Sequence, residues 1–226
     1  MEKLFKPLIW VEGLIASGKS SFSREVAKRL NLRLIEEPVD ESTAISNPYL
    51  ELFYKDPKKW AFSMQVYLLH QRYAMQQLAA YEATGVGGYA GAMLDRSLSG
   101  DLVFAKMLMK SGHIEPLDFR TYLIAYNIMC RSLLPPTLLI YLDVQPQTAF
   151  NRMKKRSRNA EAGVPLEYLI ELRKGYIELI AEAEKALLPW AHSMRICRIP
   201  WDFDIHDEKE WDAIALTVKD ACKTIG

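Results

Sequence analysis

Eight residues near the start of the chain could hold a phosphate group. Gly13 to Ser20 follow the pattern of a glycine, four residues of any type and then Gly-Lys-Ser, directly after an apolar run. In such a loop the backbone wraps phosphate oxygens, the next helix directs N–H groups at them, the lysine neutralises charge and the serine can ligate Mg²⁺. The pattern predicts a bound nucleoside triphosphate, and leaves an NTPase, a GTPase switch and a small-molecule kinase open.

Polar side chains at the ends of other predicted strands could serve a phosphoryl acceptor, because ligands of open α/β sheets bind beyond the carboxyl ends of the strands. Glu36 and Glu37 end one strand, and either carboxylate could take the proton of an attacking hydroxyl or be a solvated loop acid. Asp95 could hold Mg²⁺, and Arg96 could bridge the acceptor oxygen and the phosphoryl group. An Asp-Arg dipeptide also forms ordinary salt bridges.

A long helix predicted over 56–83 carries two further polar residues. Gln65 and Arg72 are seven residues apart and therefore share a face after two turns. Gln offers a donor beside an acceptor, which matches the edge of a base, and Arg offers a planar fork. An exposed polar stripe is the alternative. Asp56 is the expected N-cap, with Pro57 at the first helical position.

Alternating strands and helices must position these residues. Short apolar runs at 7–12, 32–37, 92–95, 137–144 and 194–199 predict five strands, and helical periodicity fills the segments between them. Such alternation is typical of a parallel sheet covered by helices on both faces. The expected fold class is α/β, and residues 1–226 are expected to form one domain.

Composition excludes several classes of partner. The 29 Lys and Arg balance 28 Asp and Glu, so the net charge of +1 gives no electrostatic case for a nucleic-acid or membrane partner. Cys130, Cys197 and Cys222 lie far apart without CxxC spacing, which argues against disulfides and zinc. No leader or membrane-spanning run of about 20 apolar residues is evident, so we expect a cytoplasmic protein.

Five stretches in order resemble the deoxynucleoside kinase family: "GLIASGKSS", "EEPV", "YKDPKKWAFSMQ", "DRSLSGD" and "RMKKRSRNAEAGVPLEYLIEL". The resemblance runs from Trp10 to about Leu172 and is looser beyond. It implies a P-loop kinase fold with a five-stranded parallel sheet and a short arginine-rich lid at about 152–164. It also implies ATP-dependent phosphorylation, with Mg²⁺, of the 5′-hydroxyl of a deoxynucleoside, for nucleotide salvage.

The same resemblance implies a role for each matching residue. The catalytic residues would be Glu37 as general base, Arg96 and Lys19, and the metal would be served by Ser20 and Asp95. The residues expected to bind ATP are Gly13, Leu14, Ile15, Ala16, Ser17, Gly18, Lys19, Ser20, Ser21, Arg152, Arg156 and Arg158. The residues expected to bind the nucleoside are Glu37, Tyr54, Gln65, Arg72, Arg96, Asp101 and Glu161, with Tyr54 and Glu161 at the 3′-hydroxyl.

Arg72 and Asp101 bear on which base is accepted. Both positions are charged in the family's deoxycytidine, deoxyguanosine and deoxyadenosine kinases and apolar in its thymidine-accepting branch, and a charged pair suits a purine better than the thymine methyl group. We therefore expect a purine deoxynucleoside, with a deoxycytidine-preferring or broad-specificity kinase as the alternative. Ser42 stands where some relatives carry a tryptophan that flanks the base, and together with the small Gly100 it suggests room for a larger base. Ala16 stands where the family usually has glycine.

Two other functions remain open, and one assembly is expected. A nucleoside monophosphate kinase shares the phosphate loop and lid, and an inactive kinase-like subunit would keep the fold without turnover. Family members are commonly homodimers packed through helices, and apolar faces within 57–84 and 117–134 permit this.

Overall fold

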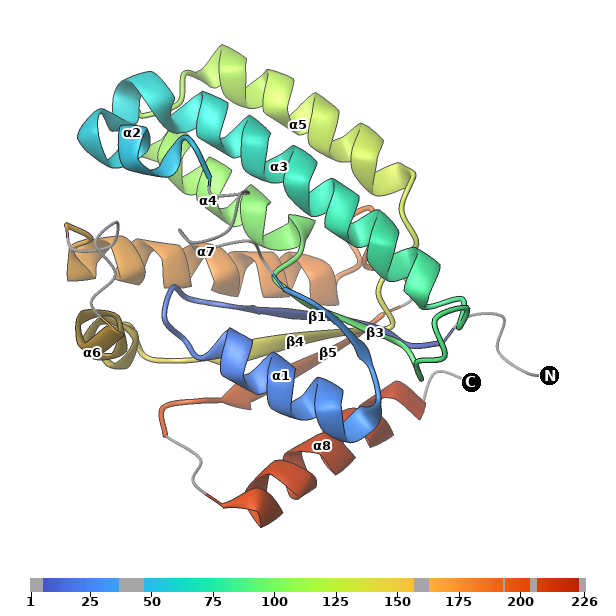
Figure 1. Ribbon diagram of the computed structural model, residues 1–226. Helices are drawn as coiled ribbons and strands as arrows, with labels where there is room; N and C mark the ends of the chain where they lie inside the picture. Colours follow the sequence, from blue (N-terminus) through green and yellow to red (C-terminus); the bar gives the residue numbers. More distant parts are fainter. Residues whose placement is uncertain (1–5, 37–46, 157–162, 193, 204–206, 224–226) are drawn as a thin grey trace.

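The computed structural model describes residues 6–36, 47–156, 163–192, 194–203 and 207–223. Within them, one five-stranded sheet forms the centre of the molecule (Figure 1), with all strands parallel in the order β2-β3-β1-β4-β5. The strands are β1 (Leu8–Gly13), β2 (Arg33–Ile35), β3 (Ala92–Asp95), β4 (Leu138–Asp143) and β5 (Arg195–Pro200). The predicted α/β fold with a five-stranded parallel sheet is therefore confirmed.

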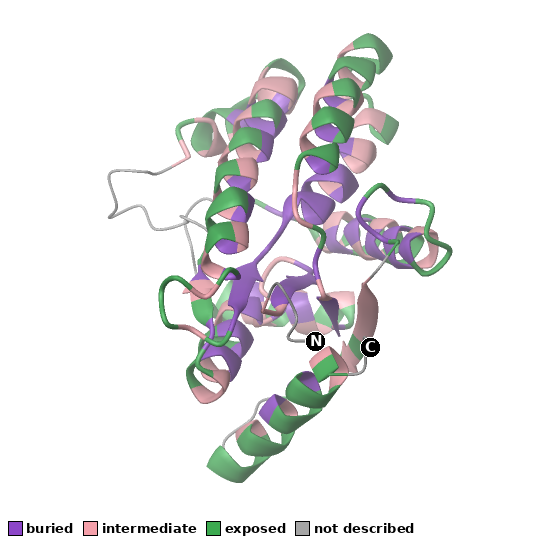
Figure 2. Cartoon of the chain, turned by 90° about the vertical axis from the view of Figure 1, so that its right-hand side faces the viewer, coloured by how far each residue is buried: buried purple, intermediate pink, exposed green. Residues whose placement is uncertain are grey.

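Helices cover both faces of the sheet, and the central strands between them are buried (Figure 2). In Figure 1, α1 and α8 lie on one face, while α3, α4, α5 and α7 lie on the other. The helices are α1 (Lys19–Leu30), α2 (Leu50–Lys55), α3 (Pro57–Glu82), α4 (Leu98–Lys110), α5 (Pro116–Arg131), α6 (Pro146–Arg156), α7 (Leu166–Glu184) and α8 (Glu208–Lys223). None of these described helices is long and apolar enough to span a membrane.

Local sequence signals explain where the longest helix begins. The Asp56 side chain accepts a hydrogen bond from the Lys59 N–H at 3.2 Å, and Pro57 occupies the first turn. This capping satisfies an N–H group that has no partner within the helix, and proline loses nothing there because its missing N–H would have been unpaired. The predicted cap is confirmed, and Gln65 and Arg72 are among the buried residues of the helix.

The central strands consist almost wholly of buried residues. All six residues of β1 and the first five of β4 are buried, as expected for strands covered on both faces. Glu12 is the charged exception in β1, with none of its surface exposed. The edge strands are shorter or half exposed, and β2 spans only three residues of the predicted run 32–37.

Candidate active site

The phosphate loop connects the end of β1 to the first turn of α1. A Cβ atom at Gly13 would lie 2.9 Å from Ser17 Oγ and 3.0 Å from the Leu142 carbonyl oxygen, so only glycine fits. Gly18 is the N-cap of α1 with a left-handed φ of 94°. The Lys19 ammonium is buried and donates to the carbonyl oxygens of Gly13 at 3.2 Å and Leu14 at 2.7 Å. The loop thus gathers a cation and helix N–H groups at one point, as phosphate binding requires.

Ala16 carries backbone strain within this loop. Its φ of 56° is left-handed, a conformation that costs a residue with a Cβ atom roughly 1–2 kcal/mol. Glycine avoids this cost but loses more entropy on folding. We expect Ala16→Gly to raise the free energy of unfolding by up to about 1 kcal/mol and the melting temperature by about 2–4 °C.

Thermal unfolding of the purified variant measures this effect. Ala27→Gly is a matched control, because Ala27 lies in the middle of α1 and glycine there should lower stability by about 1 kcal/mol. A melting temperature of Ala16→Gly below that of the wild type would contradict the assignment of strain to Ala16.

Ser20 and Asp95 lie together, as predicted for a metal site. Ser20 Oγ donates to Asp95 Oδ2 at 2.5 Å, which joins the first turn of α1 to the end of β3. Asp95 Oδ1 is buried and has no hydrogen-bond partner among the described residues. A hydroxyl and a carboxylate with a spare oxygen are hard ligands that suit Mg²⁺, which usually takes one or two protein oxygens and completes its shell with water and phosphate. The residues present therefore fit the predicted ion.

Arg96 follows Asp95 at the same edge of the sheet. Its backbone has a left-handed φ of 74°, and its side chain is 8% exposed. The guanidinium donates from Nη1 to Tyr176 Oη at 3.2 Å and lies 5.5 Å from the centre of the Phe104 ring. Arg96 is thus held between α4 and α7 beside the phosphate loop.

Tyr168 lies near two other groups of the predicted site. Burial raises its pKa, the nearby Tyr54 adds to this rise and the Arg96 charge opposes it, so Tyr54 and Arg96 both lie within electrostatic reach of Tyr168. Tyr54 is a half-buried residue of α2. The Tyr168 phenol therefore stays neutral near pH 7 and can donate a hydrogen bond to a ligand.

The predicted base-binding residues are buried between α3 and α4. Arg72 of α3 forms an ion pair with Asp101 of α4, and their side chains are 6% and 0% exposed. Gln65 lies on the same buried face of α3, and neither its amide oxygen nor its amide nitrogen has a partner within the described structure. Buried amides are nearly always paired, so Gln65 indicates a ligand that offers both a donor and an acceptor.

Two of the three arginines of the predicted lid, Arg152 and Arg156, are described. Arg152 on α6 donates to the carbonyl oxygens of Trp201 and Phe203, both at 2.9 Å, and to that of Ser17 at 3.4 Å. It therefore links α6 to the phosphate loop and to the segment after β5. Arg156 is the exposed last residue of α6. Glu37, Ser42, Arg158 and Glu161 lie outside the described residues.

The structure adds residues that the sequence patterns did not single out. Four such residues interact with Arg96 or with a residue bonded to it: Glu12, Phe104, Tyr168 and Tyr176. Gly100 has a different role from the one expected: a Cβ atom there would lie 2.6 Å from Glu12 Oε2. The space beside Gly100 is therefore filled by the Glu12 carboxylate, and the expectation that it enlarges the base pocket is wrong.

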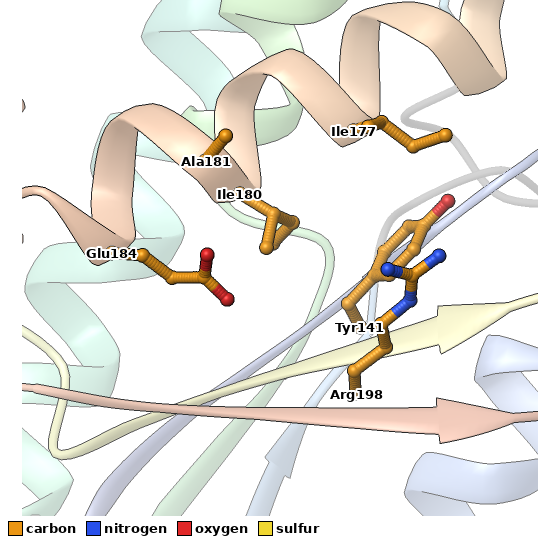
Figure 3. A pocket seen from close by; sticks show the side chains of 6 residues that line it. All are labelled: Tyr141, Ile177, Ile180, Ala181, Glu184 and Arg198. Carbon is orange, nitrogen blue, oxygen red and sulfur yellow. The ribbon is translucent and has the colours of Figure 1, made fainter.

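A small cavity lies away from these residues (Figure 3). It has a volume of about 110 Å³ between α7 and the strands β4 and β5. Its arginine, Arg198, lies over the Tyr141 ring and pairs with Asp143 at 2.6 Å. No predicted site residue lines this cavity, so it is not the candidate site.

Comparisons with known proteins bear on the family to which the chain belongs. The family model described as deoxynucleoside kinase matches residues 9–223. The chain is 35% identical over 201 residues to deoxyadenosine kinase of Dictyostelium discoideum, covering 89% of this chain and 75% of that protein. It is 33% identical over 183 residues to deoxyguanosine kinase of the same organism, covering 79% and 60%. A solved structure of deoxyadenosine kinase from M. mycoides with bound dCTP superposes with a TM-score of 0.76 at 28% identity, covering 94% of this chain and 99% of that one.

Proposed function

The chain belongs to the deoxynucleoside kinase family, and from this premise we propose that it transfers the γ-phosphoryl group of ATP to the 5′-hydroxyl of a purine deoxyribonucleoside. The product would be a deoxynucleoside monophosphate for nucleotide salvage. The observation that carries the proposal is the buried Gln65 amide, which has no partner among the described residues and lies on the same face of α3 as Arg72, the partner of Asp101. These polar groups would bind an acceptor molecule, which a simple NTPase would not need.

Each residue of the proposed site has its own role in phosphoryl transfer. Lys19 and the first turn of α1 bind the phosphates, and Arg96 orients the acceptor oxygen and stabilises the transferring group. Glu37 acts as general base. Mg²⁺, held by Asp95 and Ser20, would neutralise charge on the phosphates when bound. Tyr54 and Glu161 would bind the 3′-hydroxyl of the sugar.

The lid is proposed to close over the triphosphate. We treat residues 1–226 as one kinase domain with a lid at about 152–164, which contains Arg152, Arg156 and Arg158. Arg152 already reaches the phosphate loop through the Ser17 carbonyl oxygen. Exclusion of water by such a lid strengthens charge interactions in the site and suppresses hydrolysis of ATP.

A purine is favoured by the charges in the base pocket. The Asp101 carboxylate can accept a hydrogen bond from a base N–H, and the Arg72 fork can donate to O6 or N7. A buried charged pair offers no favourable contact to the thymine methyl group. The deoxyadenosine and deoxyguanosine kinases among the relatives support this preference, and deoxycytidine remains the alternative acceptor.

Product formation tests the proposal. The full chain with Mg²⁺, ATP and each of the four deoxynucleosides in turn should form a monophosphate, fastest with deoxyadenosine or deoxyguanosine. Glu37→Gln in the same assay should reduce kcat by roughly 10²–10⁴-fold while deoxynucleoside binding persists. Activity on deoxynucleoside monophosphates alone would favour the monophosphate kinase, and binding without turnover would favour an inactive subunit.

We propose that two copies associate through α5. The helix exposes Leu117, Ile124 and Ile128 along one side, with 71%, 57% and 60% of their surfaces accessible. Their spacing of seven and four residues forms an apolar stripe, and stripes of this kind mark protein interfaces. The family's common dimeric state supports this surface as a homodimer contact.

The double variant Ile124→Glu/Ile128→Glu should convert the dimer to a monomer, because four buried carboxylates would face one another across a two-fold contact. Light scattering after size-exclusion chromatography measures the mass. Leu216→Glu is the matched control, since Leu216 is an aliphatic residue of α8 that is 56% exposed on the opposite side of the sheet. A monomeric wild type, or a dimeric double variant, would exclude this interface.

A cytoplasmic location is part of the proposal. It is supported by Cys130, Cys197 and Cys222, none of which forms a disulfide in the described structure, since disulfides are rare in a reducing compartment.

A further inference from the structure

A buried carboxylate lies behind the candidate site. Glu12 is in the central strand β1 and has none of its surface exposed. Its Oε1 atom accepts hydrogen bonds from the Ser97 N–H at 2.8 Å, Ser97 Oγ at 2.7 Å, the Gly100 N–H at 3.2 Å and Ser99 Oγ at 3.3 Å. A buried charge is costly unless it is hydrogen-bonded, and the first turn of α4 supplies both donors and a favourable helix dipole.

These contacts fix the backbone of Arg96. The left-handed φ of 74° is strained for arginine and persists only where neighbouring groups enforce it. The Arg96 N–H donates to the Val11 carbonyl oxygen at 3.0 Å, and the next N–H, that of Ser97, donates to Glu12. The N–H groups of Arg96 and Ser97 are therefore held by two consecutive residues of β1, Val11 and Glu12.

The second oxygen of Glu12 reaches the side chain of Arg96 through a tyrosine. Tyr176 of α7 is fully buried, and its hydroxyl donates to Glu12 Oε2 at 3.0 Å and accepts from Arg96 Nη1 at 3.2 Å. A phenol can do both at once. Gly100 permits the arrangement, since any larger residue would collide with the Glu12 carboxylate.

We propose that Glu12 and Tyr176 are positioning residues for Arg96. Glu12 sets the backbone of Arg96 through Ser97, and Tyr176 aligns the guanidinium toward the transferring phosphoryl group. The inference rests on the proposed role of Arg96 in phosphoryl transfer. Small misplacements of a catalytic group reduce turnover strongly, so the effect of these residues belongs in kcat and not in ground-state binding.

Tyr176→Phe tests the alignment, because it removes only the hydroxyl. We expect kcat to fall about 10-fold, with KM for the deoxynucleoside within about twofold of the wild type. In an Arg96→Lys background the same substitution should lower kcat by less than about twofold, because the guanidinium that it aligns is gone. Tyr141→Phe is the matched control: Tyr141 stacks on Tyr176 with ring centres 5.7 Å apart, but its hydroxyl has no partner among the described residues.

An unchanged kcat, or an equal fold loss in both backgrounds, would overturn the proposal. Glu12→Gln gives a second test should Tyr176→Phe fold poorly, and its kcat should fall further than that of Tyr176→Phe because it perturbs both oxygens. Crystal structures of the wild type and Tyr176→Phe provide a readout independent of turnover. A guanidinium in the same place in both would also refute the inference, whereas a wild type inactive on every deoxynucleoside would refute only the proposed function.

Discussion

Lys19→Ala is expected to lower kcat by roughly 10³-fold with little change in the fold. The Lys19 side chain is 6% exposed and its ammonium donates to the carbonyl oxygens of Gly13 and Leu14, so its charge is concentrated at the loop. In a site shielded from water, a fixed cation stabilises the charge that develops on a transferring phosphoryl group far more than it would in bulk solvent. Alanine removes this cation from the phosphate loop.

Steady-state turnover with saturating ATP and deoxyadenosine measures this loss, and thermal unfolding checks the fold. Lys28→Ala is the matched control on the exposed side of the same helix and should retain wild-type kcat. Lys19→Arg should also fail, because a planar fork cannot replace a compact ammonium in this loop. Turnover of Lys19→Ala within about twofold of the wild type would remove Lys19 from the mechanism, given the much larger loss that electrostatic stabilisation predicts.

Arg72→Met should destabilise the protein by about 3–5 kcal/mol. The substitution leaves the Asp101 carboxylate, whose side chain has no exposed surface, without its ion-pair partner. The double variant Arg72→Met/Asp101→Leu should recover most of the loss, since breaking a buried ion pair is far worse than replacing it with apolar groups. The same double variant should move base selectivity toward thymidine.

Urea denaturation of Arg72→Met, Asp101→Leu and the double variant measures the free energies of unfolding that a double-mutant cycle compares. Lys110→Met is the control for a surface pair: Lys110 and Glu178 are 61% and 52% exposed, and the loss should stay below about 1 kcal/mol. Additive losses in the double variant would mean that Arg72 and Asp101 do not act as a pair, and unchanged base selectivity would place the pair outside the pocket.

Hydrophobic patterns were sufficient to predict the fold. All five strands and the Asp56 cap followed from local apolar runs and turn residues, because a doubly covered parallel sheet leaves a strong local signal. The resemblance to the kinase family implied that Ser20 and Asp95 serve the same metal ion, and the two side chains do meet, at 2.5 Å. The ends of the strands are predicted less accurately than their existence: β2 spans only three residues of the predicted run 32–37.

The contacts that hold Arg96 in place could not be predicted from the sequence. Glu12 appears in the sequence as a polar end to an apolar strand, and only folding brings it to Gly100, 88 residues away. Gly100 was misread for this reason, since a small residue indicates nearby volume without identifying the group that fills it. Tyr176 follows the apolar period of α7, so its sequence pattern does not distinguish it from core residues such as Leu172 and Leu179.

One competition experiment tests the central claim, that a purine deoxynucleoside is the acceptor. The four deoxynucleosides at equal concentration, with limiting ATP and Mg²⁺, are converted in proportion to kcat/KM, and mass spectrometry of the monophosphates gives all the ratios at once. The account predicts that dAMP or dGMP accumulates first and dTMP last. Preferential formation of dTMP, or no monophosphate while ATP is bound, would contradict it.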